Sequence, residues 1–396
     1  MELWIQWWKV VWQLRSTCSR LRTFLWFSTC LAGMTVRGDL LGVTSFVRSL
    51  GLIETCYDRI LDFFHSKALN LEKLTRTWVA LILKTHPSLL RINGKLVLVG
   101  DGLKVSKAGK KMPAVKRLHQ QSDSNTKPEY IMGHSCQAIA ILAGALQGIF
   151  AIPLVSRIHE GVIYSNRDKR TFLDKMVLLI DSLEMGEKFY YIADAYYASR
   201  KIIRGLLAQG NHLITRVRSN AVAYFPAEPP LKSKGPGRPP IYGEKIHLRD
   251  LFNDPVLMQT AQSQVLGVYA YHFWMKTMTP IRRTSGNQHL HRKSTSYRNA
   301  VRRKIDAYHR YIQTGLISQG LLMYLSSVFP KLVWAHFGSW IRTIRPGICP
   351  SELVTAIAMR NTLTEFLADS NKTSILTKFI RERIDISRTE GLRMIA

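Results

Sequence analysis

Two short apolar runs in this sequence each lead directly into an aspartate. Residues 96–99 read Leu-Val-Leu-Val and are followed by Gly100-Asp101-Gly102, and residues 188–193 contain Phe-Tyr-Tyr-Ile-Ala and are followed by Asp194. Short continuous apolar runs rich in β-branched and aromatic residues are typical of buried strands. The two runs therefore predict two strands of one sheet, each ending at an acid.

The segments around these runs alternate between strand and helix patterns. A strand-rich start followed by strand–helix alternation is typical of a mixed α/β sheet flanked by helices. We expect the core of this sheet domain in residues 94–220 and, after an interruption, in residues 291–345. Further strands are predicted at 137–143, 150–155 and 212–217, and helices at 167–183, 199–208 and from Ser296 to about Leu325.

Residues 1–93 predict a helical N-terminal region, and residues 346–396 predict a C-terminal one. The N-terminal helices carry Lys and Arg between them, which suits either a DNA-reading module or a plain helical cap. The longest apolar stretch, residues 24–36, is shorter than the ~20 residues of a membrane-spanning helix. We expect the tryptophans at 4, 7, 8 and 12 to belong to a packed, basic amphipathic helix, with association of residues 1–35 with a membrane surface as the alternative.

The composition changes between residues 226 and 243, where clustered Pro and Gly exclude a helix or a central strand. Short apolar runs on both sides predict a β-rich, basic insertion over residues 221–290. Lys234 and Arg238 lie in the Pro/Gly segment. A positive extended loop of this kind suits the minor groove of DNA, and an exposed, proline-stiffened loop is the alternative.

The charge of the chain indicates a polyanionic partner. The sequence has 56 Lys+Arg against 27 Asp+Glu, a net charge of +29 and a pI near 10.2, which favours nucleic acid first and a membrane surface second. A hydrophobic content of 46% excludes a disordered tail. The five cysteines are odd in number and form no C-x-x-C pair, which argues against a disulfide framework or a thiolate zinc site and for a reducing compartment.

The two aspartates indicate a site for divalent cations. If their strands are neighbours, Asp101 and Asp194 lie close together, and two like charges there are unfavourable unless a cation bridges them. Oxygen ligands without a Cys or His cluster favour Mg²⁺ or Mn²⁺, and two such ions can bind the attacking and leaving oxygens of a phosphoryl transfer. The alternative is that each aspartate caps a turn, which Gly102 makes credible for Asp101.

A third acid is expected on the long helix. Asp306 is the only acidic residue in the segment 255–351, and it shares an i, i+4 stripe with Arg302 and Arg310. A surface ion pair with either arginine is the alternative explanation, although such a pair is worth only about 0.3–0.5 kcal/mol. Glu352 is the alternative third acid. The apolar stripe predicted to face the core of this helix is Val301, Ile305, Tyr308, Ile312 and Leu316.

Basic residues follow both aspartates. Arg200 begins the helix after Asp194, and four lysines come soon after Asp101. Side chains of this type contact phosphates rather than read bases, and a solvated loop is the alternative for the lysines. The four lysines are Lys104, Lys107, Lys110 and Lys111.

Together these features resemble an insertion-sequence transposase of the DDE superfamily, which has an RNase H-like catalytic core with a β-rich insertion. The resemblance rests on residues 100–102, on Ile-Ala-Asp-Ala-Tyr-Tyr at 192–197, on the Gly-Pro-Gly-Arg-Pro-Pro segment and on the basic helix after it. It covers roughly residues 90–345. In related transposases with such an insertion, the third helix carries Tyr, Arg, Glu and Lys at fixed spacing. Arg302 fits the arginine, whereas Asn299, Asp306 and Gln313 stand in place of the tyrosine, glutamate and lysine.

The resemblance implies a cut-and-paste DNA transposase. Asp101, Asp194 and Asp306 would hold Mg²⁺ or Mn²⁺ for phosphodiester hydrolysis and strand transfer, and Arg302 and Arg310 would contact DNA. The partners would be double-stranded DNA, as terminal inverted repeats and as target, and a second copy in a synaptic complex. No membrane or small-molecule substrate is expected, and the location would be the bacterial cytoplasm at the nucleoid. A decayed transposase that only binds DNA and a related RNase H-like nuclease are the alternatives.

Overall fold

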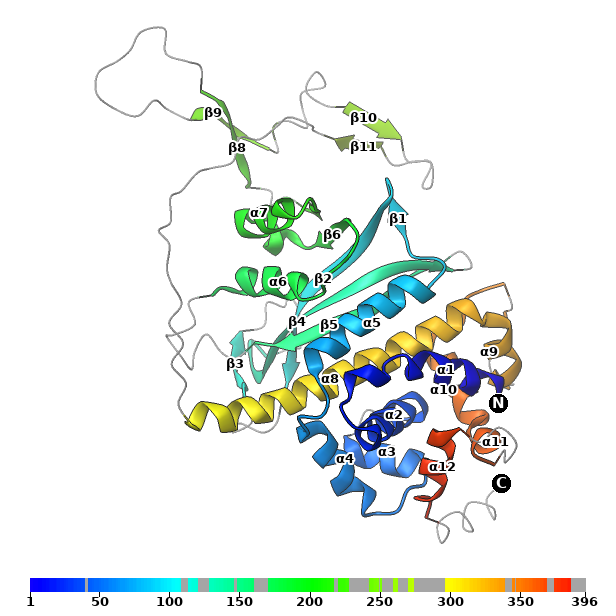
Figure 1. Ribbon diagram of the computed structural model, residues 1–396. Helices are drawn as coiled ribbons and strands as arrows, with labels where there is room; N and C mark the ends of the chain where they lie inside the picture. The colour runs from blue at the N-terminus through cyan, green and yellow to red at the C-terminus, as the bar shows by residue number, and fades with distance from the viewer. Residues whose placement is uncertain are drawn as a thin grey trace. The chain divides into compact units, whose positions relative to one another are not determined.

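The structure is a computed structural model of the chain (Figure 1). The chain divides into two compact units: a core unit made of Met1–Ile214 with Ser294–Ala396, and an inserted unit, Thr215–Lys293. The residues that the structure describes are 1–39, 42–107, 113–119, 128–145, 148–159, 170–216, 220–227, 242–248, 250, 259–262, 270–273, 296–338, 344–345, 347–368 and 374–385.

The core unit contains a mixed seven-stranded sheet. Its central path runs β3-β4-β2-β6-β7, with β5 on β4 and β1 on β2. β2, β4 and β5 are antiparallel to one another in turn, and β6 lies parallel to β2. A meander of three antiparallel strands whose first strand pairs in parallel with the fourth is the order expected of an RNase H-like core, so the predicted mixed α/β class is confirmed. The strands are β1 (Arg91–Ile92), β2 (Lys95–Ser106), β3 (Lys116–His119), β4 (Tyr130–Ala145), β5 (Gly148–Ile158), β6 (Phe189–Ala193) and β7 (His212–Thr215).

β2 is longer than its apolar run. Residues 96–98 are buried, as the run predicts, but the strand continues beyond Asp101 because its pairing with β4 extends to Ser106 opposite Gly133. The expectation that the strand ends at Asp101 is therefore wrong: this aspartate lies within β2, where burial gives way to exposure. Pairing along one edge prolongs the strand after hydrophobic burial has ceased, and an apolar run does not record that pairing.

Two helices follow β5 and β6. α6 (Phe172–Asp181) leads into β6, and α7 (Arg200–Ala208) leads from β6 to β7. The two helices pack on each other, with Gly205 of α7 so close to Val177 of α6 that a Cβ would lie 2.8 Å from a valine methyl. The side chain of Thr171 caps the N-terminus of α6, and the side chain of Ser199 caps the N-terminus of α7.

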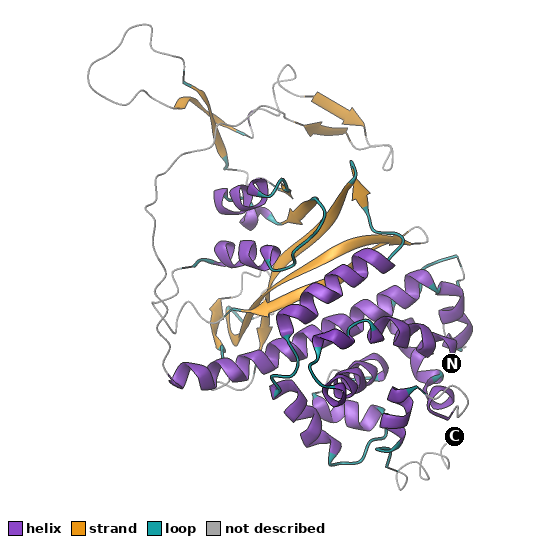
Figure 2. Cartoon of the chain, viewed as in Figure 1, coloured by secondary structure: helices purple, strands orange, loops and turns teal. Residues whose placement is uncertain are grey.

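The N-terminal and C-terminal helices form one layer beside the sheet (Figure 2). Trp4 and Trp7 are fully buried, and the Trp4 indole donates to the carbonyl of Met359 over 2.9 Å. The tryptophan-rich start is therefore mostly core, with Trp12 the more exposed. The helices are α1 (Glu2–Trp12), α2 (Leu21–Val36), α3 (Val43–Ser49), α4 (Cys56–His65), α5 (Leu71–Thr85), α8 (Ser296–Val328), α9 (Pro330–Phe337), α10 (Glu352–Asn361), α11 (Leu363–Ala368) and α12 (Ile375–Arg381), with short 3-10 turns η1 (Arg15–Thr17) and η2 (Ala195–Tyr197).

The long helix α8 links the sheet to this layer, because it contacts β5 as well as α2, α4 and α10 (Figure 1). Its buried stripe differs from the apolar one that the sequence predicted. Arg310 and Gln313 are buried, whereas Tyr308, Ile312 and Leu316 are only half-buried. Gln313 donates to the carbonyl of Leu154 in β5 and Arg310 donates to that of Phe64 in α4, which lets these polar side chains occupy the packed stripe. The Nε of Arg310 is buried without an acceptor among the described residues.

The inserted unit contains two small antiparallel pairs within its described residues. β8 (Val222–Pro226) pairs with β9 (Tyr242–His247), and β10 (Gln259–Gln262) pairs with β11 (Ala270–Phe273). The sequence also predicted strands in this segment.

All five cysteines are free, so none forms a disulfide. Among the described residues, no single helix has the length and apolar character to cross a membrane. One bent pair, Ile305–Val328 with Pro330–Phe337 at 102°, meets those criteria when its two helices are taken together.

Candidate active site

Asp101 and Asp194 lie at matching positions on two parallel strands in the middle of the sheet. The register of β2 and β6 pairs Val99 with Ile192. Two residues further along both strands, the same register brings Asp101 beside Asp194, which directly follows β6. Because side chains alternate between the faces of a strand, this register places both carboxylates on the face that carries Val99 and Ile192. Both aspartates are exposed.

Each carboxylate also accepts a local backbone hydrogen bond. Asp101 Oδ1 accepts from the N–H of Gly102 over 2.6 Å, and Asp194 Oδ1 accepts from the N–H of Tyr196 over 3.1 Å. Asp194 thereby caps the one-turn helix η2. The capping role proposed as the alternative is therefore present for Asp194, whereas Asp101 lies within β2 and caps no turn. Both bonds are compatible with a ligand role, because each uses only one oxygen of a carboxylate.

Two buried tyrosines lie near the carboxylate pair. The pKa of Tyr191 is raised above its ordinary range, and that of Tyr197 is raised to about 12. Burial is the largest cause of both shifts, and the charges of Asp101 and Asp194 contribute to both in the same direction. Both carboxylates thus act on the same two hydroxyl groups, which agrees with their neighbouring positions in the register. The Tyr-Tyr pair after Asp194 was expected only as part of a family motif, and no role was predicted for either tyrosine.

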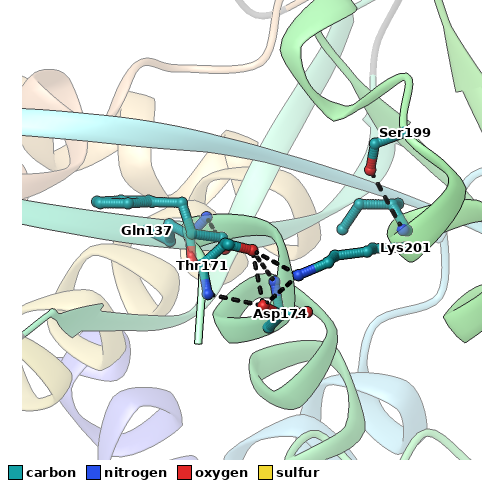
Figure 3. A network of polar contacts seen from close by, with 7 residues as sticks. Gln137, Thr171, Asp174, Ser199 and Lys201 are labelled. Carbon is teal, nitrogen blue, oxygen red and sulfur yellow. Dashed lines mark hydrogen bonds and ion pairs between the residues drawn. The ribbon is translucent and has the colours of Figure 1, made fainter. Parts of the chain in front are cut away.

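A hydrogen-bond network links Gln137 with the starts of α6 and α7 (Figure 3). Gln137 on β4 donates to the Tyr197 hydroxyl over 3.2 Å and to the carbonyl of Phe172 over 3.0 Å. At the start of α6, the Lys201 ammonium donates to Asp174 over 2.6 Å and to Thr171 over 3.2 Å. Burial alone would raise the pKa of Asp174, but the hydrogen bonds from Lys201 and Thr171 outweigh it and lower the pKa. The starts of both helices are therefore fixed next to the pair.

The structure does not bring the proposed third acid to this pair. Asp306 is half-buried on α8, next to Arg310 on the same helix. Burial lowers the pKa of Arg310, and the charge of Asp306 offsets only part of that shift. Glu352, the alternative, lies at the start of α10 and accepts from Gln319 over 3.3 Å. Within the part of the chain that the structure describes, no group of three His, Cys, Asp or Glu side chains could hold a metal ion.

The basic residues predicted to contact DNA occupy different settings. Lys104 is exposed and donates to the carbonyl of His119 over 2.7 Å, and Lys107 is half-buried. Arg310 is buried and donates to the carbonyl of Phe64 over 3.0 Å, so here it belongs to the packing between α8 and α4. Lys110, Lys111, Lys234, Arg238 and the side chain of Arg302 lie outside the described residues.

Arg200 carries two buried side-chain nitrogens without an acceptor in the described residues, and Arg310 carries one, its Nε. Arg200 is the first residue of α7, six positions after Asp194, and the two nitrogens are its Nε and Nη2. A buried guanidinium without an acceptor is costly, and a phosphate or carboxylate oxygen is its usual partner. These two nitrogens are therefore donors for which the described residues supply no acceptor.

The donor set of the site suits a hard divalent cation. Two exposed carboxylates at one register level supply oxygen ligands, and Mg²⁺ is commonly held by one or two carboxylates together with substrate phosphates. Asp101 and Asp194 therefore fit part of the ligand set of a Mg²⁺ or Mn²⁺ site.

The strand order and the two adjacent aspartates define an RNase H-like α/β protein with an acidic pair on its central parallel strands. The family model described as DDE superfamily endonuclease matches residues 23–272. This match spans more than half of the chain, and the chain belongs to that family. The chain is also similar to a piggyBac transposase, solved by cryo-EM as a synaptic complex with hairpin DNA, with 12% sequence identity and a TM-score of 0.34 over 91% of this chain and 75% of that one. No curated protein matches the chain.

Proposed function

We propose that this protein is a transposase that cleaves DNA at the ends of an insertion sequence and joins the liberated ends to target DNA. The observation that carries the proposal is the register of β2 and β6, which, continued two residues beyond Val99 and Ile192, brings Asp101 beside Asp194 in a chain of the DDE superfamily endonucleases. In such a site, bound Mg²⁺ or Mn²⁺ would supply an activated water and stabilise charge on the phosphate in transfer. Asp101 and Asp194 would hold the cation on the exposed side of the sheet.

Asp306 remains our proposed third ligand, because it is the only acid on α8. Its interaction with Arg310 is of the i, i+4 kind and would be worth about 0.3–0.5 kcal/mol on an exposed helix, so this contact alone would not hold it in place. For Asp306 to join Asp101 and Asp194, the first turns of α8 would have to move relative to β2. Glu352 would have to leave the start of α10, which makes it the weaker candidate.

DNA binding by the same surface is supported by charge and by Arg200. A net charge of +29 attracts the phosphate backbone and predicts strongly salt-dependent affinity. Arg200, six positions after Asp194, offers donors that lack an acceptor in the described part of the chain, and its side chain would position a phosphate without reading sequence. Lys104 is exposed on β2, but strand alternation turns it to the face opposite Asp101, so a phosphate that it contacts would lie away from the carboxylate face.

The finer features of the proposal follow from the family resemblance. The substrates would be terminal inverted repeats and target DNA, two copies would act together because two ends must be brought together, and the setting would be the bacterial cytoplasm. The inserted unit, with Lys234 and Arg238, would add DNA contacts.

A plasmid-nicking assay tests the proposal. Supercoiled DNA carrying one element end is incubated with Mg²⁺ or Mn²⁺ and the wild-type chain, Asp101→Asn or Asp194→Asn. Each substitution is expected to lower the nicking rate by about 10² or more, because it removes a ligand oxygen charge. Asp62→Asn is the matched control, since Asp62 is an exposed residue of α4. Full activity of both site variants would refute the proposed site, and strand-transfer products would separate a transposase from an RNase H-like nuclease.

A DNA-binding protein that has lost cleavage is the second candidate. One observation favours it: in the described residues no third acid joins Asp101 and Asp194. Salt-dependent binding to the element end without nicking in either metal would establish this candidate.

A further inference from the structure

The face of the sheet behind the carboxylates is occupied by two tyrosines. Gly100 and Gly102 flank Asp101 on β2 and, by strand alternation, present their open side to the opposite face. A Cβ on Gly100 would collide with the hydroxyl of Tyr191, and a Cβ on Gly102 would lie 3.4 Å from the hydroxyl of Tyr197. Gly100 therefore leaves room for the hydroxyl of Tyr191 from β6, and the hydroxyl of Tyr197 from η2 lies at ordinary contact distance from the open side of Gly102.

Tyr197 is anchored to the strand beside Asp101. Its side chain is 1% exposed, and its hydroxyl accepts from the side-chain nitrogen of Gln137, which is fully buried. Gln137 lies directly opposite Gly102 in the register of β4 and β2. A second hydrogen bond from the same nitrogen to the carbonyl of Phe172 fixes the amide in this orientation. Gln137 therefore connects the neighbourhood of Asp101 with the residue that ends η2.

The same turn carries the other carboxylate. Asp194 caps η2, and the N–H of Tyr197 donates to the carbonyl of Asp194 over 3.1 Å. Asp194 follows the end of β6 directly and so lies outside the strand ladder. The hydrogen bond between Tyr197 and Gln137 thus ties the turn that holds Asp194 to β4, the strand that pairs with Asp101.

We propose that Tyr197 and Gln137 are positioning residues that set the separation of the Asp101 and Asp194 carboxylates for binding a divalent cation. This inference rests on the function proposed above. Neither residue would touch the cation; their hydrogen bond would hold the η2 turn in place before the cation arrives. Side chains that orient metal ligands in this way typically contribute 10–100-fold to metal affinity.

Mn²⁺ binding to the full chain, followed by the EPR signal of free Mn²⁺, tests the proposal. Tyr197→Phe removes only the hydroxyl, and Gln137→Met removes the amide at similar length. We expect each to weaken Mn²⁺ binding about 10-fold and to raise the Mn²⁺ concentration for half-maximal nicking, with the rate at saturating Mn²⁺ within about twofold of wild type. Tyr196→Phe is the matched control, because Tyr196 is the adjacent tyrosine and is 48% exposed. It should bind Mn²⁺ like the wild type.

The double variant makes the test specific to the hydrogen bond. If the two residues act through one bond, Tyr197→Phe with Gln137→Met should bind Mn²⁺ no more weakly than the worse single variant. Circular dichroism and thermal melting check that each variant is folded, and Gln137→Met decides the matter if Tyr197→Phe does not fold. Binding by both single variants at wild-type affinity, with binding lost in Asp101→Asn, would overturn this inference alone. Equal binding by wild type and Asp101→Asn would overturn the proposed metal site and the inference with it.

Discussion

Arg157 of β5 donates a hydrogen bond to the side-chain oxygen of Gln313 on α8 over 3.0 Å. Gln313 is fully buried and also donates to the carbonyl of Leu154, while Arg157 donates to Thr75 on α5. Burial lowers the pKa of Arg157 to about 10. The network joins the sheet, α5 and α8 at the position where the resembling transposases carry a lysine.

Gln313→Lys should therefore destabilise the protein. A lysine would bring a second buried cation beside Arg157 and remove the oxygen that accepts its hydrogen bond, at a cost of about 3–5 kcal/mol. Urea unfolding measures the change. Gln319→Lys is the control on the same helix, since Gln319 is exposed and lies next to Glu352, and it should stay within about 0.5 kcal/mol of wild type. Equal stability of both variants would contradict the assignment of Gln313 to this network.

Arg200→Met should change DNA binding and stability in opposite directions. It removes a cation near the proposed phosphate site, which should weaken DNA binding and lower the salt slope of the affinity by about one. It also removes buried donors that lack an acceptor in the described structure, and this should raise the free energy of unfolding by about 1–3 kcal/mol. Fluorescence anisotropy at several salt concentrations and urea unfolding measure the two effects. Met at the exposed Arg204 of the same helix should leave the unfolding free energy unchanged; a loss of stability in Arg200→Met would mean that the guanidinium has a structural partner.

Gly100→Ala should destabilise the protein through a clash with Tyr191. The added Cβ would lie 2.7 Å from a ring carbon as well as against the hydroxyl, and such overpacking costs about 1–3 kcal/mol. Tyr191→Phe should recover part of the loss, since it removes the hydroxyl but not the ring. Gly186→Ala is the control, because a Cβ there meets no atom within 4 Å. Thermal melting compares wild type, the two single variants, the double variant and the control, and additive effects of Gly100→Ala and Tyr191→Phe would argue against the contact.

His309 should make stability fall on acidification. Burial lowers its pKa to about 4, and its Nε2 lies 3.1 Å from the N–H of Ile158, which donates to the neutral ring. A folded-state pKa below the unfolded value of about 6.5 favours the neutral form. The neutral ring of His309 therefore adds about 3 kcal/mol to the free energy of unfolding. This amount is fully present above pH 6.5 and is lost as the pH drops toward 4. Urea unfolding between pH 7 and 4.5 should show a smaller loss in His309→Gln than in wild type. His65→Gln, at an exposed position, should keep the wild-type profile.

The strands that carry the aspartates could be predicted from the sequence because burial leaves a direct pattern. Residues 96–99 and 189–193 are apolar because they lie in the middle of a covered sheet. The residues alone do not show that these two strands are parallel neighbours, since pairing between distant strands leaves no local pattern. The continuation of β2 to Ser106 was missed for the same reason.

The polar residues that fix the site could not be found in this way. Gln137, Tyr191 and Tyr197 are buried, but their roles depend on partners from other elements. On α8, the helical period predicted an apolar face toward the core. Which face is buried also depends on the hydrogen-bond acceptors that β5 and α4 present to the helix. Arg310 finds the carbonyl of Phe64, and Gln313 finds Arg157 and Leu154, so both occupy core positions that apolar residues were expected to fill.

The hydrogen bond from the Trp4 indole to the Met359 carbonyl has a consequence for folding during synthesis on the ribosome. α2, buried along nearly its whole length, contacts α8, α10 and α12, all of which are synthesised after the inserted unit. Until those helices emerge, the apolar surface of α1 and α2 has no complete partner. A nascent chain that stops before Glu352 would expose this surface to solvent, and such exposure promotes aggregation. The hydrophobic core of the core unit is therefore complete only after α10 and α12 have been synthesised and have packed against α1 and α2.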